Sequence, residues 1–285
     1  MKFEARPLGA GLYLVATPIG NARDITLRAL DVLASADMIA AEDTRTARRL
    51  MEMHGLTPGG RSLVAYHDHS TERDRARIVD RIAAGGSVAY VSEAGTPLLA
   101  DPGFRLARAV REAGGEVTAV PGASALLSAL SVGGMPTDRF LFCGFLPAAK
   151  AARRAELVDL AATRATLVFY ESPKRIASLL EDLREVLGGG RPVSLCRELT
   201  KKFEEVVQGT LDTVDAGTLT LKGEYVVLVG TATEGGAVTD DEIDAALRQA
   251  MAHMRVKDAA TAVAGALGLP RRDVYQRALA IGREY

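Results

Sequence analysis

The sequence has few of the residues that build disulfide-linked, metal-bound or membrane-embedded folds. Of its 285 residues none is tryptophan, and only Cys143 and Cys196 are cysteine. Two distant thiols make neither a disulfide framework nor a metal quartet. No stretch reaches the roughly 18 uncharged apolar residues of a membrane span, and residues 1–6 lack the apolar core of a signal peptide. We therefore expect a cytoplasmic protein.

Neither sign of charge dominates the chain. Lysine and arginine number 35 and aspartate and glutamate 36, so the formal net charge is −1. Without a positive field over the whole molecule, any nucleic-acid binding must rest on local basic patches. Hydrophobic residues make up 48% of the chain, which is typical of a globular protein and excludes disorder over the whole chain. At roughly 150 residues per domain, the length predicts about two domains.

Short apolar runs alternate with amphipathic segments through the first part of the chain. Strands that alternate with helices predict a parallel sheet, the arrangement of an α/β domain. The expected strands are 11–16, 38–41, 63–66, 88–91 and 117–120, and the expected helices are 26–34, 44–53, 72–83 and 104–113.

A second series of elements follows the fifth strand. Its last three strands lie close together in sequence, as antiparallel neighbours do. The expected helices are 124–130, 147–162 and 173–186, and the expected strands are 140–143, 166–170, 193–196, 204–208 and 225–229.

These patterns predict two α/β domains and a helical module. The first domain covers residues 1–121 and the second 122–232, with a hinge near Pro121 and Gly122. The glycine-containing segment 233–238 is expected to be a linker, and 239–285 to be helical. There, a turn at 268–270 precedes a basic helix, which is typical of a helix-turn-helix. The module could contact nucleic-acid phosphates or pack on a dimer.

Ligands of open α/β sheets bind in the loops after the carboxyl ends of the parallel strands. Residues 17–21 form a tight turn before a helix, without the GxGxxG or GxxxxGK[ST] spacing of common nucleotide sites. Residues 92–103 form a long loop rich in turn residues, which favours a functional role. Small residues at 121–125 allow a ligand close to the backbone, or serve the hinge alone.

Charged residues follow the second and third strands. Glu42 and Asp43 end the second strand: Asp43 could cap the next helix, and a carboxylate fixed there could accept a proton. His67 and His69 flank Asp68 after the third strand. No third metal ligand is evident, so substrate binding, proton relay and a plain polar loop stay open, and we expect no metal.

Taken together and in order, these loops resemble the ribosomal RNA small subunit methyltransferase I family, part of the tetrapyrrole methylase superfamily. The resemblance covers roughly residues 11–230 and rests on several short motifs. One departure is Glu93, where the family usually has aspartate. The motifs are TPIGN at 17–21, AEDTR at 41–45, HDH at 67–69, VSEAGTP at 91–97, DPG at 101–103, FYESP at 169–173 and RELTK at 197–201.

The resemblance implies a two-domain tetrapyrrole-methylase-like fold, usually a homodimer, with S-adenosylmethionine in the cleft between the domains. It implies methylation of the ribose 2′-hydroxyl of one cytidine in the decoding region of 16S ribosomal RNA, so the partner is that RNA or the small subunit. The donor is expected at positions that match the family's loops, which are Pro18, Ser92, Glu93, Gly95, Thr96, Ser124, Ala125, Tyr170, Glu171 and Leu199.

A ribose hydroxyl is a poor nucleophile when neutral, so a nearby base or a cation should assist it. Glu42 matches the position of a proton-accepting carboxylate in related porphyrin methylases, and we expect it to be the base, with Asp43 and His67 as further candidates. Arg45 is expected to pair with a phosphate or with the alkoxide. Two alternatives stay open: a tetrapyrrole methylase, and a non-catalytic DNA-binding regulator that uses the C-terminal tail.

Overall fold

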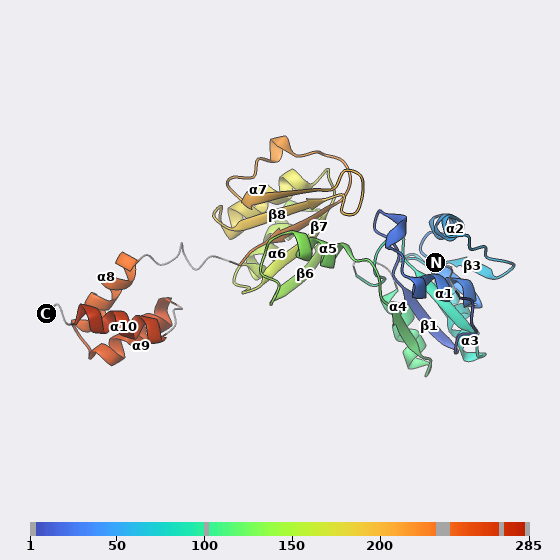
Figure 1. The fold of residues 1–285 in the computed structure, drawn as a ribbon, viewed down its shortest axis with the longest axis horizontal. Helices are drawn as coiled ribbons and strands as arrows, with labels where there is room; N and C mark the ends of the chain where they lie inside the picture. Colours follow the sequence, from blue (N-terminus) through green and yellow to red (C-terminus); the bar gives the residue numbers. More distant parts are fainter. Residues whose placement is uncertain (1–3, 100–102, 232–239, 268–270, 283–285) are drawn as a thin grey trace.

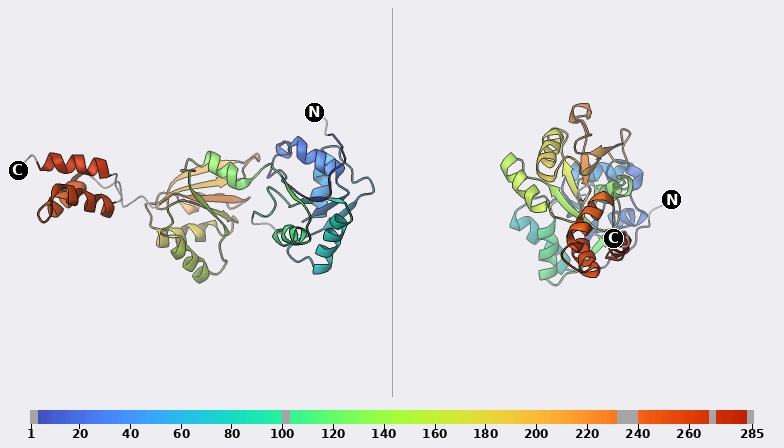
Figure 2. Two further views of the ribbon diagram at one scale, coloured as in Figure 1. Left: turned by 90° about the horizontal axis from the view of Figure 1, so that it is seen from below. Right: turned by 90° about the vertical axis from the view of Figure 1, so that its left-hand side faces the viewer.

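The computed structural model describes residues 4–99, 103–231, 240–267 and 271–282. Two five-stranded sheets follow one another along the chain, with strand orders β3-β2-β4-β1-β5 and β6-β7-β10-β8-β9. Figures 1 and 2 show the sheets beside each other, and the last three helices apart from both.

Every strand pair of the first sheet is parallel, as the alternating pattern predicted. Alternate side chains of each strand point to opposite faces, and each face is buried under a pair of helices. Helices α1 and α2 cover one face and α3 and α4 the other. The strands are β1 (Gly11–Val15), β2 (Met38–Ala41), β3 (Ser62–Ala65), β4 (Ser87–Val91) and β5 (Val117–Val120), and the helices are α1 (Leu27–Ser35), α2 (Thr44–Met53), α3 (Glu72–Ala83) and α4 (Phe104–Glu112).

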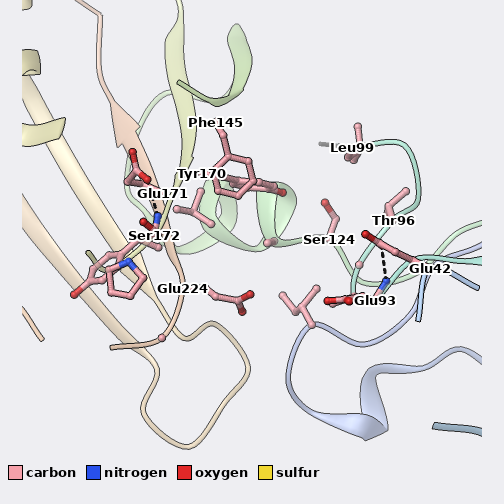
Figure 3. Close-up of a pocket in the computed structure, with 18 residues that line it drawn as sticks. Glu42, Glu93, Thr96, Leu99, Ser124, Phe145, Tyr170, Glu171, Ser172 and Glu224 are labelled. Carbon is pink, nitrogen blue, oxygen red and sulfur yellow. Dashed lines mark hydrogen bonds between the residues drawn. The ribbon is translucent and has the colours of Figure 1, made fainter. Parts of the chain in front are cut away.

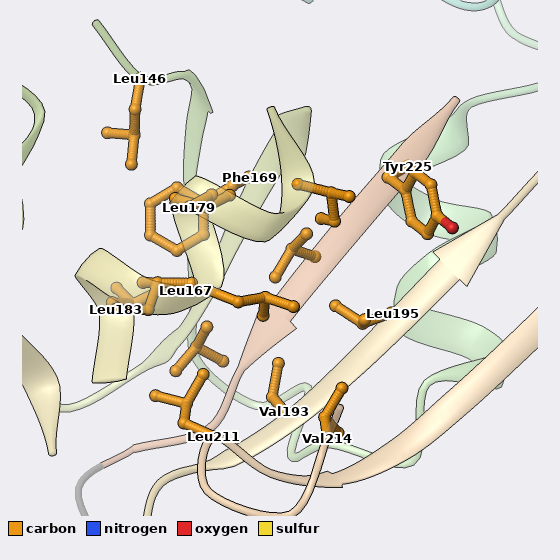
Figure 4. Close-up of a cluster of buried hydrophobic side chains, with 14 of the residues drawn as sticks. Leu146, Leu167, Phe169, Leu179, Leu183, Val193, Leu195, Leu211, Val214 and Tyr225 are labelled. Carbon is orange, nitrogen blue, oxygen red and sulfur yellow. The ribbon is translucent and has the colours of Figure 1, made fainter. Parts of the chain in front are cut away.

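The second sheet is mixed. Strands β6 and β7 are parallel, whereas β10 pairs antiparallel with β7 and β8, and β9 with β8. Helices α6 and α7 bury the core face drawn in Figure 4, and α5 covers the opposite face. The strands are β6 (Phe140–Phe145), β7 (Thr166–Glu171), β8 (Pro192–Arg197), β9 (Glu205–Thr210) and β10 (Tyr225–Val229), and the helices are α5 (Ala125–Val132), α6 (Lys150–Leu160) and α7 (Ile176–Leu187).

Several predicted boundaries in this half were wrong, and three of them have a local cause. Strand β6 runs two residues further than predicted, because Gly144, with φ of 63°, makes a bulge that lets the strand continue to Phe145. Helices α6 and α7 begin three residues later than predicted, at Lys150 and Ile176. In both, a proline lies three residues before the helix, and the chain makes a turn before it enters the helix.

The C-terminal helices are α8 (Asp240–Met251), α9 (Val256–Leu267) and α10 (Arg271–Ile281). They pack on one another around a small apolar core that includes Leu247 and Val263. Arg277 forms ion pairs with Asp240 and Asp244 within this module. The predicted linker at 233–238 and turn at 268–270 lie outside the described residues, as do residues 100–102 of the long loop. No helix in the described ranges is long and apolar enough to cross a membrane.

A buried ion cluster joins α6 to α7. The Asp182 carboxylate is inaccessible to solvent and lies 2.6 Å from both Arg153 and Arg154. Burial by itself raises the pKa of Asp182, but hydrogen bonds from Arg154 and Arg153 outweigh it and hold the pKa below the ordinary value. Helix α7 follows β7, so this cluster supports the strand whose end reaches the cavity described below.

Replacing Asp182 with asparagine should lower the free energy of unfolding by about 3 kcal/mol, because it leaves the buried Arg153 guanidinium without its counter-charge. The matched control is Glu181→Gln on the same helix, an exposed carboxylate 3.7 Å from Lys150, which should cost less than about 1 kcal/mol. Urea denaturation of the two variants measures the difference. The difference in free energy of unfolding between wild type and Asp182→Asn should disappear as the pH falls through the lowered pKa of Asp182, because the wild-type carboxylate then loses its charge.

Candidate functional site

A cavity of about 360 Å³ opens where the carboxyl ends of the first sheet's strands face the second sheet. Figure 3 shows side chains from the first half, including Glu42, Glu93 and Thr96, on one side, and Phe145, Tyr170, Glu171 and Glu224 on the other. The lining residues are Ile19, Glu42, Glu93, Ala94, Gly95, Thr96, Leu99, Ser124, Ala125, Phe145, Tyr170, Glu171, Ser172, Pro173, Gly223, Glu224, Tyr225 and Val226.

The structure brings most of the sequence-predicted residues to this cavity. Pro18, Ser92 and Leu199 do not line it, and nor do Asp43, Arg45 and His67. Leu199 borders a smaller neighbouring cavity that shares Ile19 and Ala125 with the main one. The predicted residues that do line the main cavity are Glu42, Glu93, Gly95, Thr96, Ser124, Ala125, Tyr170 and Glu171.

Backbone and side-chain hydrogen bonds hold three of the predicted loops together. Thr17 and Gly95 exchange two backbone hydrogen bonds, of 2.8 and 3.0 Å, in an isolated antiparallel bridge. The Thr96 hydroxyl donates to the Ala123 carbonyl at 3.0 Å. The buried Ser92 hydroxyl donates to the Ala94 carbonyl within its own loop, at 3.3 Å. Ser92 therefore shapes the loop rather than the cavity wall.

The Glu42 carboxylate lies at the end of β2 and is held by the loop after β4. The Glu93 amide donates to Oε2 of Glu42 at 3.1 Å, and the Glu42 amide donates to the Val91 carbonyl at 3.0 Å. Partial burial, more than any other effect, raises the pKa of Glu42, and the neighbouring charges of Glu93 and Asp68 add to it. Among the described residues, none hydrogen-bonds to Oε1. This oxygen is free to accept a proton.

Asp43 caps helix α2. Its side chain accepts hydrogen bonds from the amides of Arg45, at 2.7 Å, and Thr46, at 3.3 Å, and it pairs with the Arg45 guanidinium at 3.1 Å. The hydrogen bond from the Arg45 side chain, followed by those from the amides, lowers the pKa of Asp43. A carboxylate held in this way is a poor proton acceptor, which favours the capping interpretation over the catalytic one.

His67 lies on the loop after β3, beside Glu42 but outside the cavity. Its Nδ1 accepts a hydrogen bond from the His69 amide at 3.2 Å, so the neutral ring carries its hydrogen on Nε2. The nitrogen that remains free is therefore a donor. This geometry suits His67 to binding an oxygen of a ligand better than to accepting a proton.

The second half of the molecule supplies an aromatic and acidic wall. The Tyr170 ring meets the rings of Phe142 and Phe145 edge-on, with centroids 4.9 and 5.6 Å apart, and its hydroxyl accepts from the Leu126 amide at 3.1 Å. The buried Glu171 carboxylate accepts from the Ser172 amide at 2.7 Å and pairs with Arg175 at 3.2 Å. Glu171 therefore has a structural partner as well as a place on the wall.

A close contact beside the cavity joins the two halves of the molecule. The Asn21 amide donates to the Thr200 hydroxyl at 3.1 Å, and a Cβ on Gly20 would lie only 2.3 Å from Cγ of Lys201. Lys201 is itself fixed by ion pairs to Glu198 and Glu224, each at 2.7 Å. Gly20 is therefore needed because no side chain fits between the first loop and this turn.

Sequence reasoning missed six lining residues outside the family motifs, which are Leu99, Phe145, Gly223, Glu224, Tyr225 and Val226. The antiparallel arrangement predicted for the last strand could have pointed to Glu224, because Tyr225 pairs with Glu171 and so places the preceding residue beside the carboxyl end of β7. Phe145 was hidden by the bulge at Gly144. Leu99 ends the described part of a long loop that has no regular pattern.

Two hydroxyls at this edge make the site suitable for a polar ligand. Thr17 Oγ1 and Ser124 Oγ are buried without a hydrogen-bond partner, and Ser124 lines the cavity. A buried hydroxyl left unpaired is unfavourable, so a partner from a bound molecule would stabilise it. The described residues include no group of three or more histidine, cysteine, aspartate or glutamate side chains placed to hold a metal ion.

Comparison with known proteins agrees with this architecture. The family model of Tetrapyrrole (Corrin/Porphyrin) Methylases matches residues 11–215, and that of the RsmI C-terminal HTH domain matches 237–282. Among solved structures, the methyltransferase CobJ is similar with a TM-score of 0.56 at 23% identity, over 78% of this chain and 95% of that one. Uroporphyrin-III C-methyl transferase from Thermus thermophilus, complexed with S-adenyl homocysteine, has a TM-score of 0.54 at 22% identity, over 77% and 97%.

Sequence relatives extend over nearly the whole chain. The ribosomal RNA small subunit methyltransferase I of Mesorhizobium japonicum is 45% identical over 98% of this chain and 94% of its own length. The protein of the same name from Mycobacterium tuberculosis is 43% identical, over 96% of each chain. The expected fold class is thereby confirmed, and the chain belongs to the ribosomal RNA small subunit methyltransferase I family of the tetrapyrrole methylases.

Proposed function

We propose that this protein transfers a methyl group from S-adenosylmethionine to the ribose 2′-hydroxyl of cytidine-1402 in 16S ribosomal RNA. One observation carries the proposal: the cavity shared by the two halves has on its rim a carboxylate of raised pKa, Glu42, with one free oxygen. The relatives that match nearly the whole of this chain carry the name of a ribosomal RNA methyltransferase.

The cavity suits a cationic donor. S-adenosylmethionine supplies a methyl group on a positively charged sulfur, which needs little further activation. Four carboxylates line the cavity and favour a positive ligand electrostatically, while Ser124 offers a hydroxyl without a partner. We assign to the donor site Glu93, Gly95, Thr96, Ser124, Ala125, Tyr170 and Glu171, with Pro18, Ser92 and Leu199 shaping the loops around it.

Glu42 is the proposed base. A carboxylate whose pKa is raised holds a proton more readily than an ordinary glutamate, which suits general-base catalysis on a neutral hydroxyl. The Glu93 amide fixes Oε2, so Oε1 is the atom that would receive the proton. Asp43 orients the start of α2. Arg45 and His67 lie near Asp43 and Glu42 and would donate hydrogen bonds to the RNA.

The proposal extends to the domains, the partner and the oligomeric state of the protein. We propose domains at 1–121, 122–232 and 239–285, because β1–β5 fall in the first range, β6–β10 in the second and α8–α10 in the third. The partner is 16S ribosomal RNA or the small subunit, met in the cytoplasm, and the enzyme acts as a homodimer. The C-terminal helices would raise the affinity for RNA through contacts with its phosphates, without recognising the target base.

The function is tested by mapping ribose methylation of 16S ribosomal RNA, by mass spectrometry, in cells that lack this protein. One ribose methyl mark, on cytidine-1402, should disappear and return when the protein is restored. Retention of every ribose methyl mark would refute the assignment.

Replacing Glu42 with glutamine should lower kcat by about 10²- to 10⁴-fold, the range of a general base. Wild-type activity should rise with pH through the raised pKa of Glu42, because only the carboxylate accepts a proton, and the variant should lose this dependence. Single-turnover methylation across pH measures both effects. Donor binding by calorimetry is the control and should weaken far less than kcat falls, because Glu42 is one of four carboxylates that line the cavity. Wild-type turnover in the variant would exclude Glu42 as the base.

Replacing Ser124 with alanine should weaken binding of S-adenosylmethionine by roughly two- to tenfold, the value of one hydrogen bond. The free energy of unfolding should stay equal or rise, since an unpaired buried hydroxyl is removed. Calorimetry measures the first quantity and urea denaturation the second. Undiminished donor affinity would show that Ser124 does not contact the donor.

A further inference from the structure

Helix α2 presents a stripe of arginines that begins next to the proposed base. Arg45, Arg48 and Arg49 have the i, i+3, i+4 spacing that places side chains on one helix face, and all three are exposed. The opposite face carries the buried Ala47 and Met51. The helix begins at Thr44, two residues after Glu42, and its rise of 1.5 Å per residue places Arg48 and Arg49 roughly 6 to 8 Å along the helix axis from that start.

Two of these arginines have no charge partner. Arg45 pairs with Asp43, but across the described residues no carboxylate lies within ion-pair distance of Arg48 or Arg49. Some exposed arginines do have one, as Arg108 has Glu112 and Arg81 has Asp37, so Arg48 and Arg49 are distinguished by sharing one helix face next to Glu42. Unpaired guanidinium groups on a helix face are suited to anions with several oxygens, such as phosphates.

The loop after β3 adds donors to the same edge. Ala65 pairs with Ala41 in the sheet, and the Tyr66 amide donates to the Ala41 carbonyl at 2.8 Å, so His67 lies beside the Glu42–Asp43 segment. His67 and His69 are exposed, with ring centroids 6.1 Å apart. The free nitrogen of the neutral His67 ring is a donor, and exposed imidazole rings can stack on unpaired bases.

The charges of the cavity and of this edge are opposite. Glu42, Glu93, Glu171 and Glu224 line the cavity and would repel a phosphate, so an RNA strand can place a sugar there only if its phosphates are held outside. The arginines of α2 and the histidine loop lie at that outer position.

We propose that Arg48 and Arg49 of α2, with His67 and His69, bind the phosphate backbone of single-stranded RNA flanking the target nucleotide. This inference rests on the proposed function and assigns one surface for its RNA substrate, within the first half of the chain and separate from the C-terminal helices.

The test compares two double variants that each lose two exposed arginines. Arg48→Gln with Arg49→Gln removes the proposed contacts. Arg111→Gln with Arg139→Gln is the matched control: both arginines are exposed, and they lie at the end of α4 and before the start of β6, away from the cavity. The probe is the small ribosomal subunit from cells that lack this protein, and the measurement is Kd between 50 and 200 mM salt, the range over which phosphate contacts are lost.

Each phosphate contact on a single strand contributes about 0.7 to the slope of log K against log salt, so losing two lowers the slope by about 1.4. The affinity advantage of wild type over the Arg48/Arg49 variant should therefore shrink by about sevenfold across this salt range. Its KM for the subunit should rise while kcat and donor affinity stay unchanged. The control variant should follow wild type.

An equal slope change in both variants would show a diffuse basic surface and overturn the inference, and so would no change in either. If wild type methylates the subunit and the Arg48/Arg49 variant keeps the wild-type slope, the inference alone fails. If wild type neither binds nor methylates the subunit, the proposed function fails and the inference with it.

Discussion

The site depends on the paired backbone hydrogen bonds between Thr17 and Gly95. They join the loop after β1 to the loop after β4, and these two strands are neighbours in the middle of a parallel sheet. Because parallel strands end at one edge, their loops must meet there, and a bridge between two of them fixes the positions of the others. Glu42, Thr96 and Ser124 all take their places from this edge.

The second constraint is the contact between Gly20 and the turn at Thr200 and Lys201. It brings the first loop against the second sheet so closely that a Cβ has no room, while Asn21 donates to Thr200 at the same place. The acidic wall of β7 and β10 is thus held opposite the carboxyl edge of the first sheet. A cavity lined from both sides follows from these two contacts, and its negative charge follows from the carboxylates that each side contributes.

Charge has different roles inside and outside this cavity. Within it, partial burial raises the pKa of Glu42, while Asp43, one residue later, has its pKa lowered by hydrogen bonds from Arg45 and the helix amides. Two neighbouring carboxylates therefore differ in chemistry because one faces the cavity and the other caps a helix. Outside the cavity, the exposed arginines at the start of α2 carry positive charge close to Glu42, although the net charge of the whole chain is near zero.

The order and type of the elements were determined by the sequence, because period and turn residues are local properties: helices α2 and α3 and strands β2, β5 and β10 have the predicted bounds. The family resemblance also named eight of the residues that line the cavity. Tertiary structure decided what no local pattern contains. The bulge at Gly144 that carries Phe145 to the wall depends on pairing with β7, and the place of Glu224 depends on strand register. The capping role of Asp43 is local and could be read from the sequence, but the raised pKa of Glu42 depends on burial and on a loop 51 residues away, and that environment exists only once the chain has folded.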